Sequence, residues 1–177
     1  SVSEIDYNND EYDLEQWVNG DTATIMGFEV NYSHQLTFLP GYLSGFGISA
    51  NYTYTDSEAD MIVEGNERST ELPGQSSNMG NFAVSYEAFG FRGRLAANHQ
   101  SEFLSEVGEE DKLDYYIDKH TQLDLSLSQT VYHNTSIFLD IQNLTDEPLR
   151  EYEGNSDFPT ELEYYGRWIN FGVRVDY

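Results

Sequence analysis

The chain contains no cysteine, so it can form neither a disulfide bond nor a thiolate metal site. It also lacks a long apolar run, and no segment approaches the roughly 18 residues that a transmembrane helix needs. Basic residues are scarce: 8 lysines and arginines stand against 32 acidic residues, giving a net charge of −24. Because nucleic-acid binding relies on a basic surface, this balance argues against a nucleic-acid partner. The sequence shows no HExxH spacing and no phosphate-binding loop, and we expect no cofactor.

The acidic residues concentrate between segments of alternating polarity, within 4–21, 56–71, 102–118 and 146–163. Charge runs of this kind usually form solvated loops, and adaptation to salt would produce the same bias. The functional alternative is a negatively charged vestibule that attracts cations or cationic ligands.

In place of long apolar runs, the sequence has segments in which apolar and polar residues alternate. The last ten residues show this alternation most clearly. One face of 168–177 would carry Ile169, Phe171, Val173, Val175 and Tyr177, and the other Trp168, Asn170, Gly172, Arg174 and Asp176. A strand that ends on an aromatic residue is typical of a bacterial outer-membrane barrel, whose last strand pairs with its first. The pattern Asn170-x-Gly172-x-x-Val175-x-Tyr177 resembles the membrane-insertion signal of such barrels, with Tyr177 where Phe is more usual.

Apolar residues at every second position predict an all-β fold of seven antiparallel strands. The predicted strands cover about 24–38, 45–55, 78–88, 91–103, 121–131, 135–144 and 168–177. Short turns at 39–44, 89–90 and 132–135 alternate with long acidic segments at 56–77, 104–120 and 145–166. This asymmetry is typical of an up-and-down outer-membrane barrel. Seven strands do not close such a barrel, so we expect further strands from the same protein. We expect residues 1–22 to be part of an extracellular loop. Residues 23–177 would be a C-terminal barrel segment with short periplasmic turns and long extracellular loops.

Five motifs, in order, resemble the C-terminal third of the barrel in TonB-dependent receptors of Gram-negative bacteria. They are Ala23-Thr-Ile-Met-Gly-Phe-Glu-Val30, Leu39-Pro-Gly41, Leu72-Pro-Gly-Gln-Ser76, Asn143-Leu144-Thr-Asp146-Glu-Pro148 and the terminal strand. The resemblance implies a transporter, not an enzyme, in the bacterial outer membrane. It also implies a 22-stranded barrel with a plugged lumen, of which these would be the last seven strands.

The same resemblance implies the cargo and the partners. The cargo would be a scarce nutrient: a ferric siderophore, haem, cobalamin or an oligosaccharide. Energy would come from the inner membrane through a periplasmic coupling protein that binds the plug. The other partners would be lipid and lipopolysaccharide, the barrel-insertion machinery, and the rest of the barrel with its plug.

Ionisable residues on the polar faces of the predicted strands form a candidate lumen charge network: Glu87, Arg92, Arg94, Asp124, Asp140 and Arg174. Glu87 and Arg92 flank a tight turn in the same phase, so we expect a cross-strand ion pair. If the hairpin register places Asp124 opposite Asp140, the two could form a catalytic carboxylate pair. We favour a polar lumen network, because barrel lumens are ordinarily polar.

Two groups of aromatic residues are candidates for membrane or ligand contact. Tyr32, Tyr52, Tyr54, Tyr86 and Trp168 are expected at the membrane boundary or the lumen edge, with stacking on sugars as the alternative role. Tyr152, Tyr164 and Tyr165 lie near or in the last long loop, and they are the candidate ligand contacts because loops carry function more often than walls do.

Two other functions fit parts of the pattern. A passive porin-like or adhesive barrel fits the strands, but the 143–148 motif and the very long loops argue against it. A soluble secreted β-sandwich, such as a carbohydrate-binding module, would need polar outward faces and one core for the apolar faces of all seven strands.

Overall fold

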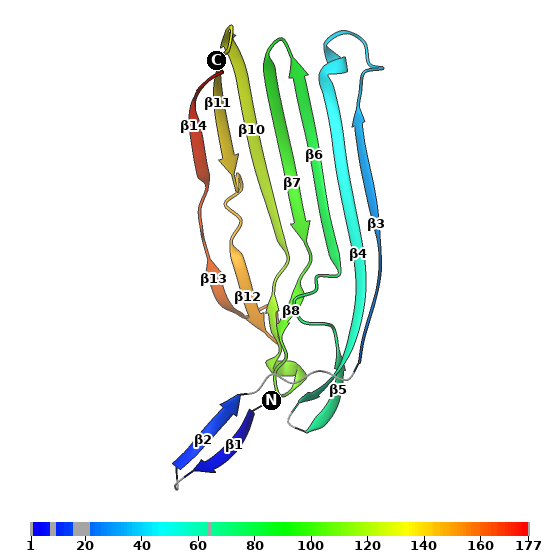
Figure 1. Ribbon diagram of the computed structural model, residues 1–177, viewed down its shortest axis with the longest axis vertical. Coiled ribbons are helices and arrows are strands. Elements are labelled where there is room, and N and C mark those ends of the chain that lie inside the picture. Colours follow the sequence, from blue (N-terminus) through cyan, green and yellow to red (C-terminus); the bar gives the residue numbers. More distant parts are fainter. Residues whose placement is uncertain (1, 8–9, 16–21, 64, 177) are drawn as a thin grey trace.

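The computed structural model describes residues 2–7, 10–15, 22–63 and 65–176. Seven long strands form an antiparallel sheet in which each strand lies beside its predecessor, in the order β14-β11-β10-β7-β6-β4-β3 (Figure 1). Their bounds are β3 Thr22–Gln35, β4 Phe46–Val63, β6 Asn78–Ala88, β7 Phe91–Gln100, β10 His120–Tyr132, β11 Thr135–Gln142 and β14 Trp168–Val175. The seven predicted wall strands and their up-and-down order are therefore confirmed. The largest difference is in β4, which continues eight residues past the predicted end at Thr55.

The tightest connection explains how the sheet keeps its register. Phe89 and Gly90 join β6 to β7, and their φ angles are +54° and +74°. Two positive φ values are the mark of a type I′ turn, whose twist matches that of the flanking strands. The pairs on either side, from Ala88↔Phe91 to Met79↔Gln100, run without a register shift. The unbroken alternation therefore keeps each residue on a fixed side of the wall.

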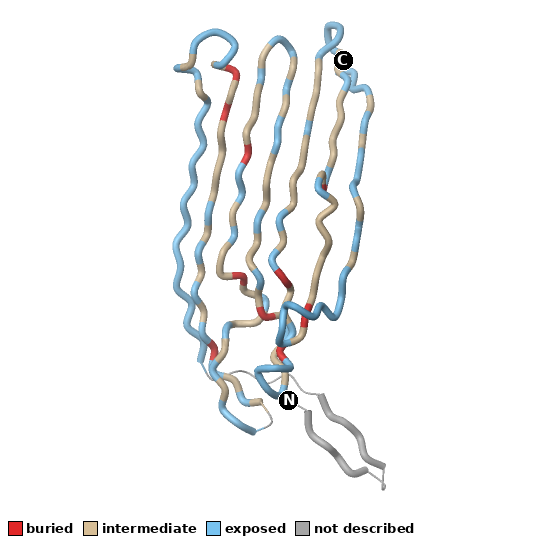
Figure 2. Tube along the Cα trace, turned by 180° about the vertical axis from the view of Figure 1, so that it is seen from behind, coloured by how far each residue is buried: buried red, intermediate tan, exposed pale blue. Residues whose placement is uncertain are grey.

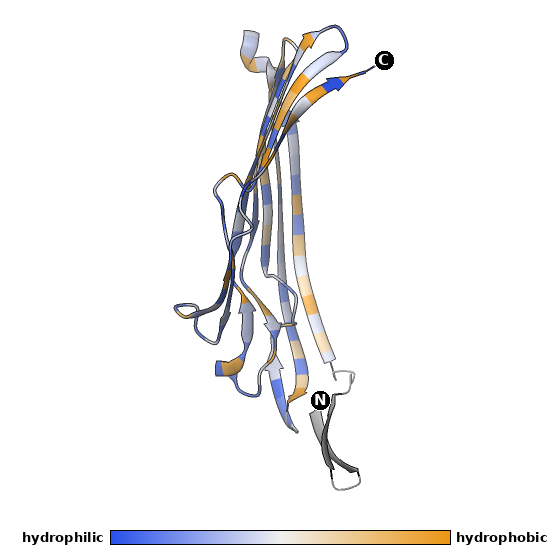
Figure 3. Ribbon diagram, turned by 90° about the vertical axis from the view of Figure 1, so that its left-hand side faces the viewer, coloured by the Kyte–Doolittle hydropathy of each residue, from blue (hydrophilic) through white to orange (hydrophobic). Residues whose placement is uncertain are grey.

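The wall has one apolar and one polar face, and the apolar face is exposed. Figure 3 shows the sheet edge-on, with apolar and polar residues alternating along the strands. On β14, Phe171 is 79% exposed and Val173 is 63% exposed. Among the described residues, the buried apolar side chains are only Ala59, Ala83, Leu104 and Tyr152, and Figure 2 shows how thinly the buried positions are scattered. A sandwich would bury these faces in a common core, and the wall has none.

The end of the wall with the long connections carries additional strands (Figure 1). β5 (Asn66–Thr70) pairs with the far part of β4. A second sheet, which we call the loop sheet, has the order β13-β12-β9-β8. Its strands are β8 Phe103–Glu106, β9 Tyr115–Ile117, β12 Leu149–Glu153 and β13 Pro159–Glu163. The long connections predicted from the sequence are thus folded, with strands too short and too acidic to show a clear period of two.

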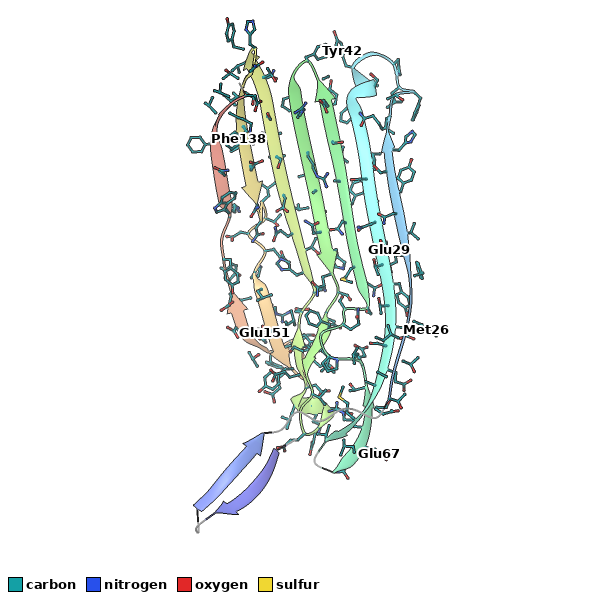
Figure 4. The ribbon with its side chains drawn as sticks, viewed as in Figure 1. Met26, Glu29, Tyr42, Glu67, Phe138 and Glu151 are labelled. Atoms are coloured by element: carbon teal, nitrogen blue, oxygen red, sulfur yellow. The ribbon has the colours of Figure 1, made fainter. Side chains whose placement is uncertain are left out.

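The N-terminal segment contains a hairpin of β1 (Val2–Tyr7) and β2 (Asp10–Glu15). Two short 3₁₀ helices complete the fold, η1 (Gly41–Gly45) at the short-turn end and η2 (Asp111–Leu113) among the long connections. No helix in the described parts of the chain is long and apolar enough to cross a membrane. Figure 4 places Tyr42 at the short-turn end, and Glu67 and Glu151 toward the opposite, long-loop end.

Candidate functional site

A buried ion pair joins two of the long connections. Arg68 on β5 donates from Nη1 to Asp114 Oδ1 at 2.9 Å and also from Nη2 to Oδ2. The backbone amide of Gly108 donates to the same Oδ1 at 2.8 Å. The Asp114 side chain is 2% exposed, and its hydrogen bond raises the pKa of Arg68. A carboxylate buried this deeply is stable only when it is paired, so the pair holds the two connections together.

A second ion pair joins the long connections 104–120 and 145–166. Arg150 on β12 donates to the Asp118 carboxylate, while the Asp118 amide donates to the Arg150 carbonyl at 2.9 Å. The strand pairing Tyr152↔Tyr116 brings their rings into a stack, with centroids 5.2 Å apart. The loop sheet is therefore built from two connections that are far apart in sequence.

One predicted ligand contact is wrong for a physical reason. Tyr152 is only 5% exposed, because it stacks on Tyr116 and its hydroxyl donates to Glu102 at 3.0 Å. Burial and this hydrogen bond raise the pKa of Tyr152. Its side chain holds the loop sheet together and is not accessible to a ligand.

The other two tyrosines stay accessible. Tyr164 is 65% exposed and Tyr165 is 76% exposed. The Tyr165 hydroxyl donates to Glu163, which raises the pKa of Tyr165. Tyr165 also lines a cleft of about 340 Å³ at the junction of the wall and the last connection, which we call the junction cleft. The cleft is also lined by His120 and Gln122 from β10, Gln142 from β11, Glu147, and Trp168 from β14.

The polar face of the wall does not contain the carboxylate pair. Asp140 lies opposite Ser126, two residues along β10 from Asp124, so the register rules out the facing arrangement. The Asp124 carboxylate instead accepts three hydrogen bonds. The donors are Gln122 Nε2 at 2.8 Å, the backbone amide of Asn143 at 3.0 Å and Asn98 Nδ2 at 3.3 Å.

The expected cross-strand ion pair between Glu87 and Arg92 is confirmed, and it is the one direct ion pair among the described members of the predicted charge network. Its Nε and Oε1 atoms lie 3.0 Å apart at the short-turn end. Arg174 lies over the ring of Phe138 instead, with its Cζ 5.4 Å from the centroid. Arg94 and Asp140 line the same cavities without an ion pair between them. The polar face therefore carries separated charges.

Comparison with known proteins identifies the chain. Residues 2–144 match the family model described as TonB dependent receptor-like, beta-barrel. The chain belongs to this family. No curated protein and no solved structure matches the chain. The matched range covers β1 through β11, while β12 to β14 lie beyond it.

The structure gives the Asn143–Pro148 motif of this TonB-dependent receptor-like barrel a physical meaning. Asn143 and Asp146 have φ angles of +53° and +60°, a region that Asn and Asp tolerate better than other side chains. The side-chain amide of the buried Asn143 donates from Nδ2 to the Glu147 carbonyl at 3.0 Å. Its Oδ1 accepts from the Glu147 backbone amide at 2.8 Å. The motif is a closed turn that ends β11 and, through Asp124, is fixed to β10.

The predicted insertion signal lies on β14 at the edge of the wall. Gly172 sits opposite Phe138, and a Cβ atom built there would lie 2.9 Å from the Phe138 ring, so the glycine makes room for that ring. Asn170 pairs with Asp140 on the polar side, and Val175 is exposed on the apolar side. Tyr177 lies outside the described residues.

Four residues that fix the long connections were not predicted from the sequence: Arg68, Asp114, Asp118 and Arg150. The acids of these segments were expected to be solvated. The available signal was the rarity of arginine: Arg68 and Arg150 are isolated cations within strongly acidic segments. Among the described residues, no cluster of three or more His, Asp or Glu side chains could hold a metal ion.

Proposed function

We propose that this chain is the C-terminal barrel segment of an outer-membrane receptor that imports a scarce nutrient with energy from the inner membrane. The observation that carries the proposal is the exposed apolar face that continues across all seven wall strands. In water a face of this size would aggregate, whereas in lipid it is the outside of a barrel. The membership of the TonB-dependent receptor-like family supports the same assignment.

The length of the apolar face supports a membrane position. On β4 the outward residues change from Tyr52 and Tyr54 to Asp56, Glu58 and Asp60. From Phe46 to Tyr54 is nine residues, within the roughly 9–11 that a transmembrane strand needs. The long-loop end would then be extracellular, and the short turns periplasmic.

Aromatic clusters mark both ends of this span. At the long-loop end the ring of Phe28 lies 6.0 Å from Tyr52 and 5.7 Å from Tyr54. At the short-turn end Tyr42 and Phe89 are 5.2 Å apart. Girdles of aromatic residues at the two interfaces are typical of outer-membrane barrels.

The test uses the full-length receptor that contains this chain, expressed in a host that lacks its own copy. Uptake of candidate nutrients (a ferric siderophore, haem, cobalamin and oligosaccharides) is measured with and without the periplasmic coupling protein. Uptake that is lost without the coupling protein is the expected result. Flux that proceeds equally well without it would contradict the proposal and favour a passive porin-like barrel.

A further inference from the structure

The junction cleft holds two accessible aromatic rings on a polar surface. Trp168 lies on the polar side of β14, where the next residues on that side are Asn170 and Gly172, yet its side chain is 55% exposed. Tyr165, three residues earlier, is exposed as well and lines the same cleft. Exposed flat rings beside polar groups suit a ligand that has both apolar and polar surface.

The polar groups of the cleft can both donate and accept hydrogen bonds. Gln122 and Gln142 contribute amides, which carry a donor and an acceptor on each side chain. The Nδ1 atom of His120 lies 3.3 Å from the Pro148 carbonyl, which can only accept, so Nδ1 is the donor in this contact and Nε2 is the ring atom left for a ligand. Hydroxyl groups also donate and accept, so this set matches a ligand rich in hydroxyls.

The charge of the cleft selects against an anion. Among the described residues that line it, none is lysine or arginine, and Glu147 supplies a carboxylate. An anionic ligand would meet no counter-charge there, in a chain whose net charge is −24. A neutral ligand carries no such penalty.

The cleft continues into a second cavity along the polar face. That cavity measures about 420 Å³, and Gln142 and Trp168 line both spaces. Each volume falls within the range of small-molecule sites, roughly 300–1,000 Å³. Two adjoining spaces that share an aromatic ring suit an elongated ligand with repeating units.

We propose that the junction cleft binds a neutral oligosaccharide, with Trp168 and Tyr165 stacking on sugar rings and with Gln122 and Gln142 bonding to hydroxyls. This inference rests on the proposed import function, because it names the class of nutrient that the receptor takes up. Trp168 lines both the cleft and the adjoining cavity, where it would contact successive sugar units.

The experiment uses the full-length receptor, purified in detergent. Calorimetric titration with malto-, cello-, xylo- and chitohexaose tests neutral oligosaccharides, and ferric citrate serves as an anionic probe. At least one hexasaccharide should bind, and Trp168→Leu should weaken that binding about tenfold or more. The matched control is Phe171→Leu on the opposite face of the same strand, which should leave the affinity unchanged. Heat-modifiable gel mobility shows whether each variant is folded, and Tyr165→Leu replaces Trp168→Leu if the latter is not.

The outcomes separate this inference from the proposed function. Absence of hexasaccharide binding, or an affinity that survives both Trp168→Leu and Tyr165→Leu, overturns the inference. If ferric citrate is nevertheless taken up only with the coupling protein, the import function stands with another cargo. If a hexasaccharide binds through Trp168 but its flux does not need the coupling protein, the cleft assignment stands and energised import fails.

Discussion

Replacing Arg68 with methionine tests whether the buried ion pair holds the long connections in place. The substitution keeps most of the aliphatic stem but removes the charge and leaves Asp114 buried at 2% exposure. Removing one partner of a fully buried pair costs about 3–5 kcal/mol. Arg68 is still 16% exposed, so water can partly replace it, and we expect about 2–3 kcal/mol at this site.

Hydrogen exchange of the reconstituted receptor measures this loss locally. A destabilisation of that size raises the opening equilibrium roughly 30- to 150-fold, so amides of 103–106, 115–117 and 149–153 should exchange faster by that factor. The wall amides should not change. Arg92→Met is the matched control. Both side chains of its ion pair with Glu87 are exposed, and such a pair contributes only about 0.2–1 kcal/mol to stability.

A double variant identifies the cause. Arg68→Met combined with Asp114→Leu removes the unpaired buried carboxylate, and it should exchange more slowly than Arg68→Met alone. Exchange of Arg68→Met within about threefold of the natural protein in these strands would show that the ion pair does not hold the loop sheet. A double variant that is less protected than Arg68→Met would show that the loss does not come from an unpaired charge.

Three further predictions concern the wall and the last long connection. Val173→Arg, on the apolar face of β14, should destabilise the receptor by about 2–4 kcal/mol in urea unfolding in lipid, whereas Asn170→Arg on the polar face should be tolerated. Asp124→Asn should cost about 1–2 kcal/mol in the same assay, because it removes the charge that accepts three hydrogen bonds. A hydrogen bond to Glu163 raises the pKa of Glu161 above 4.5. The native chain therefore binds this proton more tightly than the unfolded chain, and the added stability is present below pH 4.5 and lost as the pH rises through the folded value. Exchange in 149–163, corrected for the intrinsic pH dependence, should be slower in acid, and Glu161→Gln should abolish that difference.

The wall could be predicted because its pattern repeats. Each wall strand alternates over eight or more residues, and β6 was predicted to the residue at Asn78–Ala88. Type I′ geometry at Phe89–Gly90 and a constant register then follow from local rules. The count of seven strands added the expectation of an unclosed segment, and the sheet does end in two edge strands, β3 and β14.

The loop sheet could not be predicted, because its stability depends on contacts between distant residues. Arg68 and Asp114 are 46 residues apart, and Arg150 and Asp118 are 32 apart. Strands of three to five residues carry too few positions to show a period of two. The burial of Tyr152 could not be predicted for the same reason, because it depends on a stack with Tyr116 in another connection.

The same charges explain why the loop sheet can be both acidic and ordered. Its carboxylates repel one another, and most of them remain in water, where the repulsion is weak and screened. The two buried carboxylates, Asp114 and Asp118 on either side of β9, each pair with an arginine from another connection. Loss of either arginine would leave a buried carboxylate without its partner, which costs more than the loss of an exposed pair, so these two cations restrict the long connections more than surface cations would. An acidic composition therefore does not imply a mobile loop, and Arg68 and Arg150 mark where these connections are held.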